Sequence, residues 1–281
     1  MHKMHKLASV GQIGPLCPAP SFRAIMESMP AESTCPVCGG SGWKIVERDN
    51  LSGAQRCDCA LSARARRLEE TAAIPPLYRH VSFDNFLLPA DNPIGHRELG
   101  HVLLTVKTFA REFPAPKRPG LLLIGDPGTG KTHLAVAALR ILLSRGFEGL
   151  FFDYQNLLDR IRSGYDPAAG SADREAYRFA LDTEVLLLDD LGAHRVTDWV
   201  EDTVASIITY RCNNRKPLIA TTNLPDPDAG SAMFDRSVLG SPQYKTSLAE
   251  RIGSRARSRL FEMCRVVRMP LVEDYRLRKT V

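Results

Sequence analysis

The feature that most constrains this chain is a glycine-rich segment between an apolar run and a helical pattern. Residues 125–132 read Gly-Asp-Pro-Gly-Thr-Gly-Lys-Thr, after Leu-Leu-Leu-Ile and before a run of helix-forming apolar residues. Such a sequence folds into a strand, a tight loop and a helix, and the loop points its backbone N–H groups at phosphate oxygens. Lys131 is placed to reach the β- and γ-phosphates, and Thr132 to bind Mg²⁺. The predicted nucleotide-binding residues are Gly125, Asp126, Pro127, Gly128, Thr129, Gly130, Lys131, Thr132 and His133.

Two further segments supply the polar groups that a magnesium-bound nucleotide requires. The apolar run 185–188 leads directly into Asp189 and Asp190. Asp189 is the candidate magnesium ligand, and Asp190 is placed to orient or deprotonate the attacking water. Asn223 follows the run 218–220 and two threonines, where its amide can contact the γ-phosphate and the water. We therefore expect an ATPase site in which Lys131, Asp189, Asp190 and Asn223 are the catalytic residues.

Short apolar runs alternate with amphipathic helical patterns from residue 120 onward, which is typical of an α/β fold with a buried parallel sheet. The runs at 121–124, 150–152, 185–188, 218–220 and 264–269 predict five strands. The helices between them are expected to begin near Lys131, Asn156, Arg174, Asp198 and Ser247. Ligands of such sheets bind at the carboxyl ends of the strands, which is where the polar motifs lie.

Four of the seven cysteines form a compact group, Cys35, Cys38, Cys57 and Cys59. In a reducing compartment, thiols so close in sequence favour a structural zinc site. The glycines after Cys38 allow the tight backbone that such a site needs. An iron–sulfur cluster, or a ligand set in which Cys17 or His80 replaces one cysteine, stays open. We expect a flexible arm at 1–32, a zinc-binding docking domain with a linker helix at 33–72, and the ATPase domain at 73–281.

Composition excludes several classes of protein. Hydrophobic residues make up 44% of the 281 residues and charged residues 25%, which is ordinary for a globular chain. Neither a signal peptide nor an 18-residue apolar run is visible, so we expect a cytoplasmic protein without a membrane partner. The net charge is +5, and residues 245–281 hold ten basic and four acidic residues, a local charge of +6. This segment suits a phosphate-facing surface, with a solvated helical face as the alternative.

Several motifs together resemble the AAA+ ATPases of the DnaC/DnaI/IstB-like group, which includes helicase loaders and transposition helpers. They are Ile74-Pro-Pro-Leu-Tyr-Arg, Phe83-Asp-Asn-Phe, GDPGTGKTHLA, LLLDDLG, IATTNLP and ERIGSRARSRLFEMCRVVRM, followed by Glu273-Asp-Tyr-Arg. The resemblance spans about residues 35–275 and implies that Asp189 and Asp190 are the Walker B pair and that Asn223 is sensor 1. It also implies an arginine finger, at Arg255 or at Arg259.

The resemblance raises two questions about the ATPase site. Asp190 stands where many AAA+ proteins have glutamate, which implies slow hydrolysis. Too few residues follow Asn223 for a helical lid domain, so the adenine is expected to contact the segment before the phosphate loop. Tyr78 and Phe83 are the candidates, with ordinary core packing as the alternative for each.

The implied partners follow from the arginine finger and from the basic insertion at 153–181. A finger acts on a nucleotide bound by the next subunit, so we expect head-to-tail self-association into a ring or spiral. In the resembling proteins the insertion tracks single-stranded DNA, although a solvated helix pair would look similar. The expected function is to assemble on single-stranded DNA and load a hexameric replicative helicase. The alternatives are a transposition helper that acts with a transposase on duplex DNA, and a nucleotide-gated adaptor with negligible hydrolysis.

Overall fold

The computed structural model describes residues 35–48, 51–115, 117–165, 171–230, 234–235 and 243–278. The chain divides into two compact units, and the division falls between Cys57 and Asp58. The predicted arm at 1–32 lies outside the described residues. The first unit contains a two-stranded antiparallel hairpin, β1 (Trp43–Arg48) and β2 (Leu51–Arg56), in which Trp43 faces Arg56. The sequence patterns had not indicated this hairpin.

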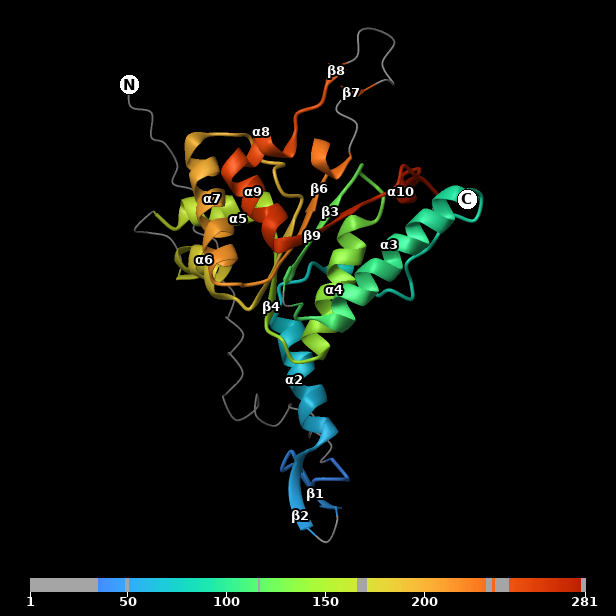
Figure 1. The fold of residues 1–281 in the computed structure, drawn as a ribbon. Helices are drawn as coiled ribbons and strands as arrows, with labels where there is room; N and C mark the ends of the chain where they lie inside the picture. Colours follow the sequence, from blue (N-terminus) through green and yellow to red (C-terminus); the bar gives the residue numbers. More distant parts are fainter. Residues whose placement is uncertain are drawn as a thin grey trace, which may run out of the picture. The chain divides into compact units, whose positions relative to one another are not determined.

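The second unit contains the remaining elements, all of which are marked in Figure 1 where space allows. Its helices are α2 (Asp58–Thr71), η1 (Pro76–Tyr78), α3 (Pro93–Glu112), α4 (Lys131–Ser144), α5 (Tyr154–Ser163), α6 (Ser171–Asp182), α7 (Asp198–Asn213), η2 (Pro227–Ala229), α8 (Leu248–Ile252), α9 (Ser254–Met263) and α10 (Tyr275–Arg278). Its strands are β3 (Gly120–Ile124), β4 (Gly149–Asp153), β5 (Val185–Asp189), β6 (Leu218–Thr222), β7 (Phe234–Asp235), β8 (Gln243–Tyr244) and β9 (Cys264–Arg268). None of the helices in the described ranges combines the length and the apolar composition needed to cross a bilayer.

The predicted five-stranded parallel sheet is confirmed, with the strand order β4-β5-β6-β3-β9. Strands β5, β6 and β3 are therefore consecutive neighbours, although they are far apart in the sequence. All the strands point the same way, so the segments that follow β3, β5 and β6 leave the sheet at one edge. This order brings the phosphate loop, the two aspartates and Asn223 to a common location.

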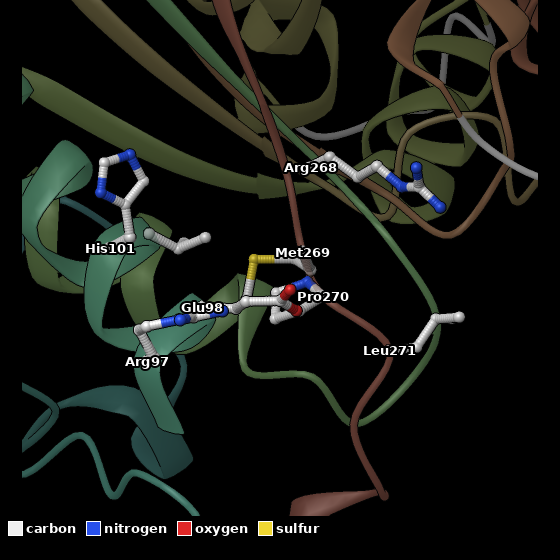
Figure 2. Close-up of a pocket in the computed structure, with 8 residues that line it drawn as sticks. Arg97, Glu98, His101, Arg268, Met269, Pro270 and Leu271 are labelled. Carbon is white, nitrogen blue, oxygen red and sulfur yellow. The ribbon is translucent and has the colours of Figure 1, made fainter. Parts of the chain in front are cut away.

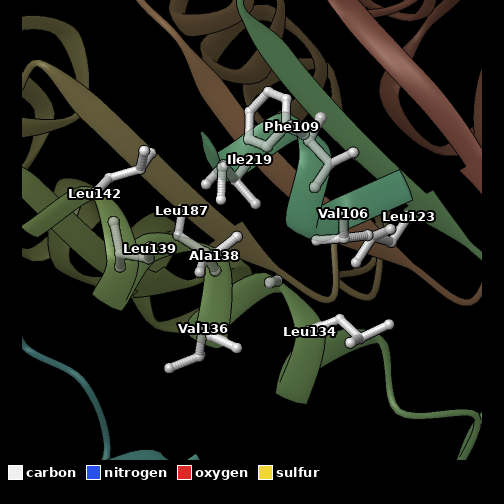
Figure 3. Close-up of a cluster of buried hydrophobic side chains, with 14 of the residues drawn as sticks. Val106, Phe109, Leu123, Leu134, Val136, Ala138, Leu139, Leu142, Leu187 and Ile219 are labelled. Carbon is white, nitrogen blue, oxygen red and sulfur yellow. The ribbon is translucent and has the colours of Figure 1, made fainter. Parts of the chain in front are cut away.

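Alternation along each strand creates two apolar layers, one on each face of the sheet. In β3, Leu121 and Leu123 face the layer under α3 and α4, whereas Leu122 and Ile124 face the layer under α5, α6, α7 and α9. Figure 1 shows these two groups of helices on opposite sides of the sheet. Figure 3 shows the first layer, where Val106 and Phe109 of α3 gather with Leu residues of α4 and with Ile219 of β6. The sheet is thus covered on both faces, and its carboxyl edge carries the polar motifs.

Helix α2 lies within the second unit, whereas the sequence placed it before a domain boundary at residue 72. The helix is fastened to α4, because Arg140 Nε lies 2.6 Å from Glu69 Oε1. Arg64 also donates to the Gly146 carbonyl at the end of α4, at 3.2 Å. These long-range contacts, which a local pattern does not reveal, make α2 part of the nucleotide-binding unit.

Candidate functional site

The phosphate loop connects β3 to α4 and is folded around one carbonyl group. Gly128 and Gly130 have φ angles of 75° and 91°, in the left-handed region that favours glycine. The Asp126 carbonyl accepts hydrogen bonds from Thr129 Oγ1 at 2.9 Å and from Lys131 Nζ at 2.8 Å. Lys131 is thereby held against the loop with only 6% of its surface exposed.

The burial of Lys131 changes its protonation. Desolvation lowers the pKa of its ammonium group to about 8, although Asp190 and Asp189 act in the opposite direction. A buried ammonium group loses the solvation that water gives it, and a bound phosphate would favour its charged form. The burial of Lys131 therefore makes its charged form sensitive to a bound phosphate.

The two predicted magnesium ligands lie side by side. Thr132 Oγ1 donates to the carboxylate of Asp189, with distances of 3.0 Å to Oδ1 and 3.2 Å to Oδ2. Thr221 Oγ1 donates to the same carboxylate at 2.6 Å. Burial raises the pKa of Asp189, and the hydrogen bonds from the two threonines oppose this effect. A hydroxyl and a carboxylate from different elements form the oxygen-rich set that Mg²⁺ prefers, so these residues fit the metal.

Asp190 and Asn223 form the other half of the polar cluster. The Asn223 side-chain amide donates to Asp190 Oδ1 at 2.6 Å, and the Asp190 backbone N–H donates to Thr221 Oγ1 at 2.9 Å. Burial raises the pKa of Asp190, while the nearby charge of Lys131 lowers it in part. Thr221 contacts both aspartates, and sequence reasoning had given it no role. Its position in the Thr-Thr-Asn sequence at the end of a strand was the available signal.

The segment before the sheet reaches the start of α4. Burial together with the charge of Asp189 raises the pKa of the Tyr78 hydroxyl, and the Thr132 side chain lowers it in part. Phe83 is 8% exposed and belongs to the apolar core under α3. Phe86 packs edge-on against His133, with 5.3 Å between the ring centres, and a side chain at position 130 would lie 2.5 Å from its ring. Phe86 is thus a neighbour of the loop, whereas the sequence analysis had placed it in a motif without giving it a role at the site.

The three arginines of α9 have different surroundings. Arg257 pairs with Asp226 and Asp228, each at 2.6 Å. Arg259 pairs with Glu262 at 2.7 Å, and this carboxylate raises the pKa of its guanidinium. Arg255 is exposed and has no ion-pair partner among the residues that the structure describes. The two candidate fingers therefore differ in how freely they can reach another subunit.

The four predicted zinc ligands come together at one point. The Sγ atoms of Cys35, Cys38, Cys57 and Cys59 all lie within 4.8 Å of one another, and none is in a disulfide. Tetrahedral zinc with Zn–S bonds of about 2.3 Å requires sulfur–sulfur distances of roughly 3.8 Å. The Cys35 and Cys57 sulfurs are 3.8 Å apart, and Gly42 N donates to Cys38 Sγ at 3.3 Å. The donor set is compatible with zinc.

The strand–loop–helix unit, the buried lysine and the aspartate pair at the sheet edge define the class of this chain as a P-loop nucleotide-binding protein. Comparison with protein-family models gives a match to "IstB-like ATP binding protein" over residues 107–257. The matched segment covers more than half of the chain and runs from α3 into α9. The chain belongs to the IstB-like family of AAA+ ATPases, as the motifs had indicated.

Individual proteins give similar results. Protein YqaM of Bacillus subtilis is 26% identical over 196 residues, which is 68% of this chain and 59% of YqaM. The match therefore spans less than two thirds of that relative's length. The replicative helicase loader DnaC of Escherichia coli K12 is 22% identical over 185 residues, 63% of this chain and 72% of DnaC. A crystal structure of the DnaC helicase loader superimposes with a TM-score of 0.55 and 31% identity, over 70% of this chain and all of that one.

Proposed function

We propose that this protein is an ATPase that assembles on single-stranded DNA and helps to load a hexameric replicative helicase. The observation that carries the proposal is the polar cluster at the sheet edge in a chain related to the helicase loader DnaC. The family membership supports ATP binding and a helper role in DNA replication. The preference for single strands, the helicase partner and the hydrolytic steps are the proposed part.

The residues of the cluster divide the chemistry of hydrolysis among them. Lys131 neutralises the β- and γ-phosphates, while Thr132 and Asp189 hold Mg²⁺. Mg²⁺ supplies charge neutralisation on the phosphate oxygens. Asp190 accepts a proton from the attacking water, and the raised pKa that its burial causes makes it a better acceptor than an ordinary aspartate. Asn223 fixes the orientation of the Asp190 carboxylate through their 2.6 Å hydrogen bond.

We assign the arginine finger to Arg255. Arg257 is occupied by two aspartates and Arg259 by Glu262, whereas Arg255 projects from the first turn of α9 into solvent. A finger completes the ATP site of a neighbouring subunit, so the active form is a head-to-tail ring or spiral. The assembled state would then depend on bound ATP.

A small aromatic and basic cluster supports contact with single-stranded DNA. The Arg162 guanidinium lies 4.7 Å from the centre of the Trp199 ring, and the ring of Tyr165 is 6.5 Å from that of Trp199. Tyr165 is 71% exposed. Exposed rings beside arginines bind unpaired bases by stacking, which paired bases in a duplex do not allow. This cluster favours single-stranded over double-stranded DNA.

We propose that the four cysteines bind zinc and that the first unit docks the protein partner. Zinc would stabilise the turn around Cys38 and the hairpin of β1 and β2 that follows it. Large apolar side chains are exposed on this unit, namely Val37, Trp43, Ile45 and Leu51. So many exposed apolar residues on one small unit are typical of a protein-binding surface.

The test is ATP turnover by the purified protein alone, with single-stranded DNA and with duplex DNA, while light scattering reports assembly. We expect single-stranded DNA to stimulate both turnover and assembly, and Lys131→Ala to abolish both. Assembly on duplex alone would replace the proposal with a transposition helper. Turnover that stays at background with every DNA would leave a nucleotide-gated adaptor.

A further inference from the structure

The residues after β9 form a strap, defined here as residues 269–278, that runs from the sheet to the phosphate loop. The strap begins at Met269, whose N–H donates to the Ile124 carbonyl at 2.7 Å. Met269 is buried and lies against the first glycine of the loop, since a side chain at position 125 would come within 2.6 Å of its Cβ. The strap starts, therefore, directly beneath the phosphate loop.

The middle of the strap follows α3. A cavity of about 650 Å³ lies between the strap and α3. Figure 2 shows Met269, Pro270 and Leu271 of the strap on one side of it and Arg97 and His101 of α3 on the other. Beyond this cavity Val272 approaches α3 so closely that a side chain at Gly95 would lie 2.9 Å from its Cγ1. The path of the strap is therefore fixed by packing.

The end of the strap is attached to the phosphate loop itself. The Tyr275 N–H donates to the Gly128 carbonyl at 3.0 Å. Any side chain at position 128 would collide with the carboxyl group of Asp274. Gly128 suits the left-handed backbone at this position, and a side chain there would displace the Asp274 carboxyl group.

This attachment holds Arg276 one residue away from the hydrogen bond between the strap and the phosphate loop. Arg276 Nη2 and Nε donate to the carboxylate of Asp274 at 2.7 and 3.0 Å. Arg276 is within electrostatic reach of Lys131 and Tyr78, where its charge is the smallest contribution to each pKa and desolvation by burial is the largest. Arg276 therefore lies within electrostatic range of Lys131, the residue that the sequence predicts to bind the β- and γ-phosphates.

We propose that Arg276 contacts the terminal phosphates of ATP bound to its own subunit and that Asp274 positions it. The guanidinium would exchange one carboxylate oxygen of Asp274 for phosphate oxygens, which it can bind in the same bidentate manner. The inference rests on the proposed binding of nucleotide at the phosphate loop. The strap lies outside residues 107–257, the segment that matches the family model.

Fluorescently labelled ATP, ADP and AMP can test the proposal by direct titration of the full chain. Replacing Arg276 with alanine should weaken ATP binding by about tenfold or more, the usual size of one charge-assisted hydrogen-bond pair, and ADP binding by less. Arg276→Lys should recover part of the loss. Arg265→Ala, which removes an exposed arginine at the far end of β9, is the matched control and should bind like the wild type.

Asp274 is tested through its dependence on Arg276. Asp274→Ala should lower ATP affinity in the wild-type background and have no further effect in the Arg276→Ala background, because it acts through that arginine. Additive losses would remove the positioning role. Equal losses for ATP, ADP and AMP, or unchanged ATP binding in Arg276→Ala, would overturn the proposal for Arg276. If the wild type binds ATP and Lys131→Ala does not, the ATP site itself is upheld, whatever the result for Arg276. If labelled ATP does not bind the wild type, both the ATP site and the role of Arg276 are refuted.

Discussion

Replacing Arg257 with alanine provides a quantitative test of how the arginines of α9 divide their roles. Arg257 Nε and Nη2 donate to the two carboxylate oxygens of Asp226 at 2.9 and 2.6 Å, and its guanidinium lies 3.9 Å from the centre of the Phe261 ring. The Asp226 side chain is only 1% exposed. Alanine at position 257 would leave that carboxylate buried without its cation, so Arg257→Ala should destabilise the fold.

The size of the loss follows from the geometry of this pair. Breaking a buried ion pair by removing one partner costs about 3–5 kcal/mol. The lower end applies here, because Asp226 keeps the hydrogen bond from the Asp228 N–H at 3.0 Å and Arg257 is 20% exposed. In a domain of this size each kcal/mol shifts the melting temperature by about 2–4 °C. We therefore expect Arg257→Ala to melt roughly 6–12 °C below the wild type.

Thermal unfolding followed by circular dichroism, without nucleotide, measures this shift. Arg255→Ala is the matched control, since it removes the same charge from the same helix at an exposed position. It should melt within about 1 °C of the wild type. If Arg257→Ala and Arg255→Ala had the same melting temperature, the ion pair between Arg257 and Asp226 would contribute nothing to stability. The assignment of Arg257 to a structural role and of Arg255 to a catalytic role would then lose its basis.

Three further predictions concern the nucleotide and metal sites. Asp190→Asn should keep magnesium-dependent ATP binding but lower turnover by about 10²–10⁴-fold in a phosphate-release assay, and wild-type turnover would remove Asp190 from the mechanism. ATP affinity should fall as pH rises above about 8, because the free protein then loses the proton of Lys131 and must regain it when ATP binds. ATP titrations at several pH values should show this decrease for the wild type and not for Lys131→Arg. Cys35→Ser with Cys38→Ser, or zinc chelation, should unfold the first unit and leave ATP affinity unchanged, as circular dichroism and titration can check.

The strands were predictable because buried parallel strands are continuous apolar runs. Each predicted run lies in an observed strand, apart from Met269, which the sequence analysis included in the last one. The strands β5 and β6 extend further, to Asp189 and Thr222, since polar residues at the carboxyl edge still pair within the sheet. The sequence thus located both the sheet and its ligand-binding edge, because both depend on local pattern.

Features that depend on distant contacts were not predictable in the same way. Arg211 looks like a surface residue in the last turn of α7, yet it is fully buried and donates to five carbonyl groups. The single helix expected from Ser247 is divided into α8 and α9 at Gly253, whose φ is 81° and whose Cα faces Glu201 of α7. The contact between the strap and Gly128 also joins residues that are far apart in the sequence. Apart from Pro217, whose carbonyl accepts from Arg211, these partners are distant in sequence.

The two adjacent aspartates show how the sheet edge produces two chemical roles. Side chains of successive residues in a strand point to opposite faces, so a straight strand would separate the carboxylates of Asp189 and Asp190. The strand ends at Asp189, and Asp190 has a left-handed φ of 55°, which aspartate tolerates better than longer side chains do. This turn directs the second carboxylate to Asn223 while the first stays with Thr132. A short acid suited to the turn reaches less far towards the phosphate than glutamate would, which gives the expected slow hydrolysis a structural cause.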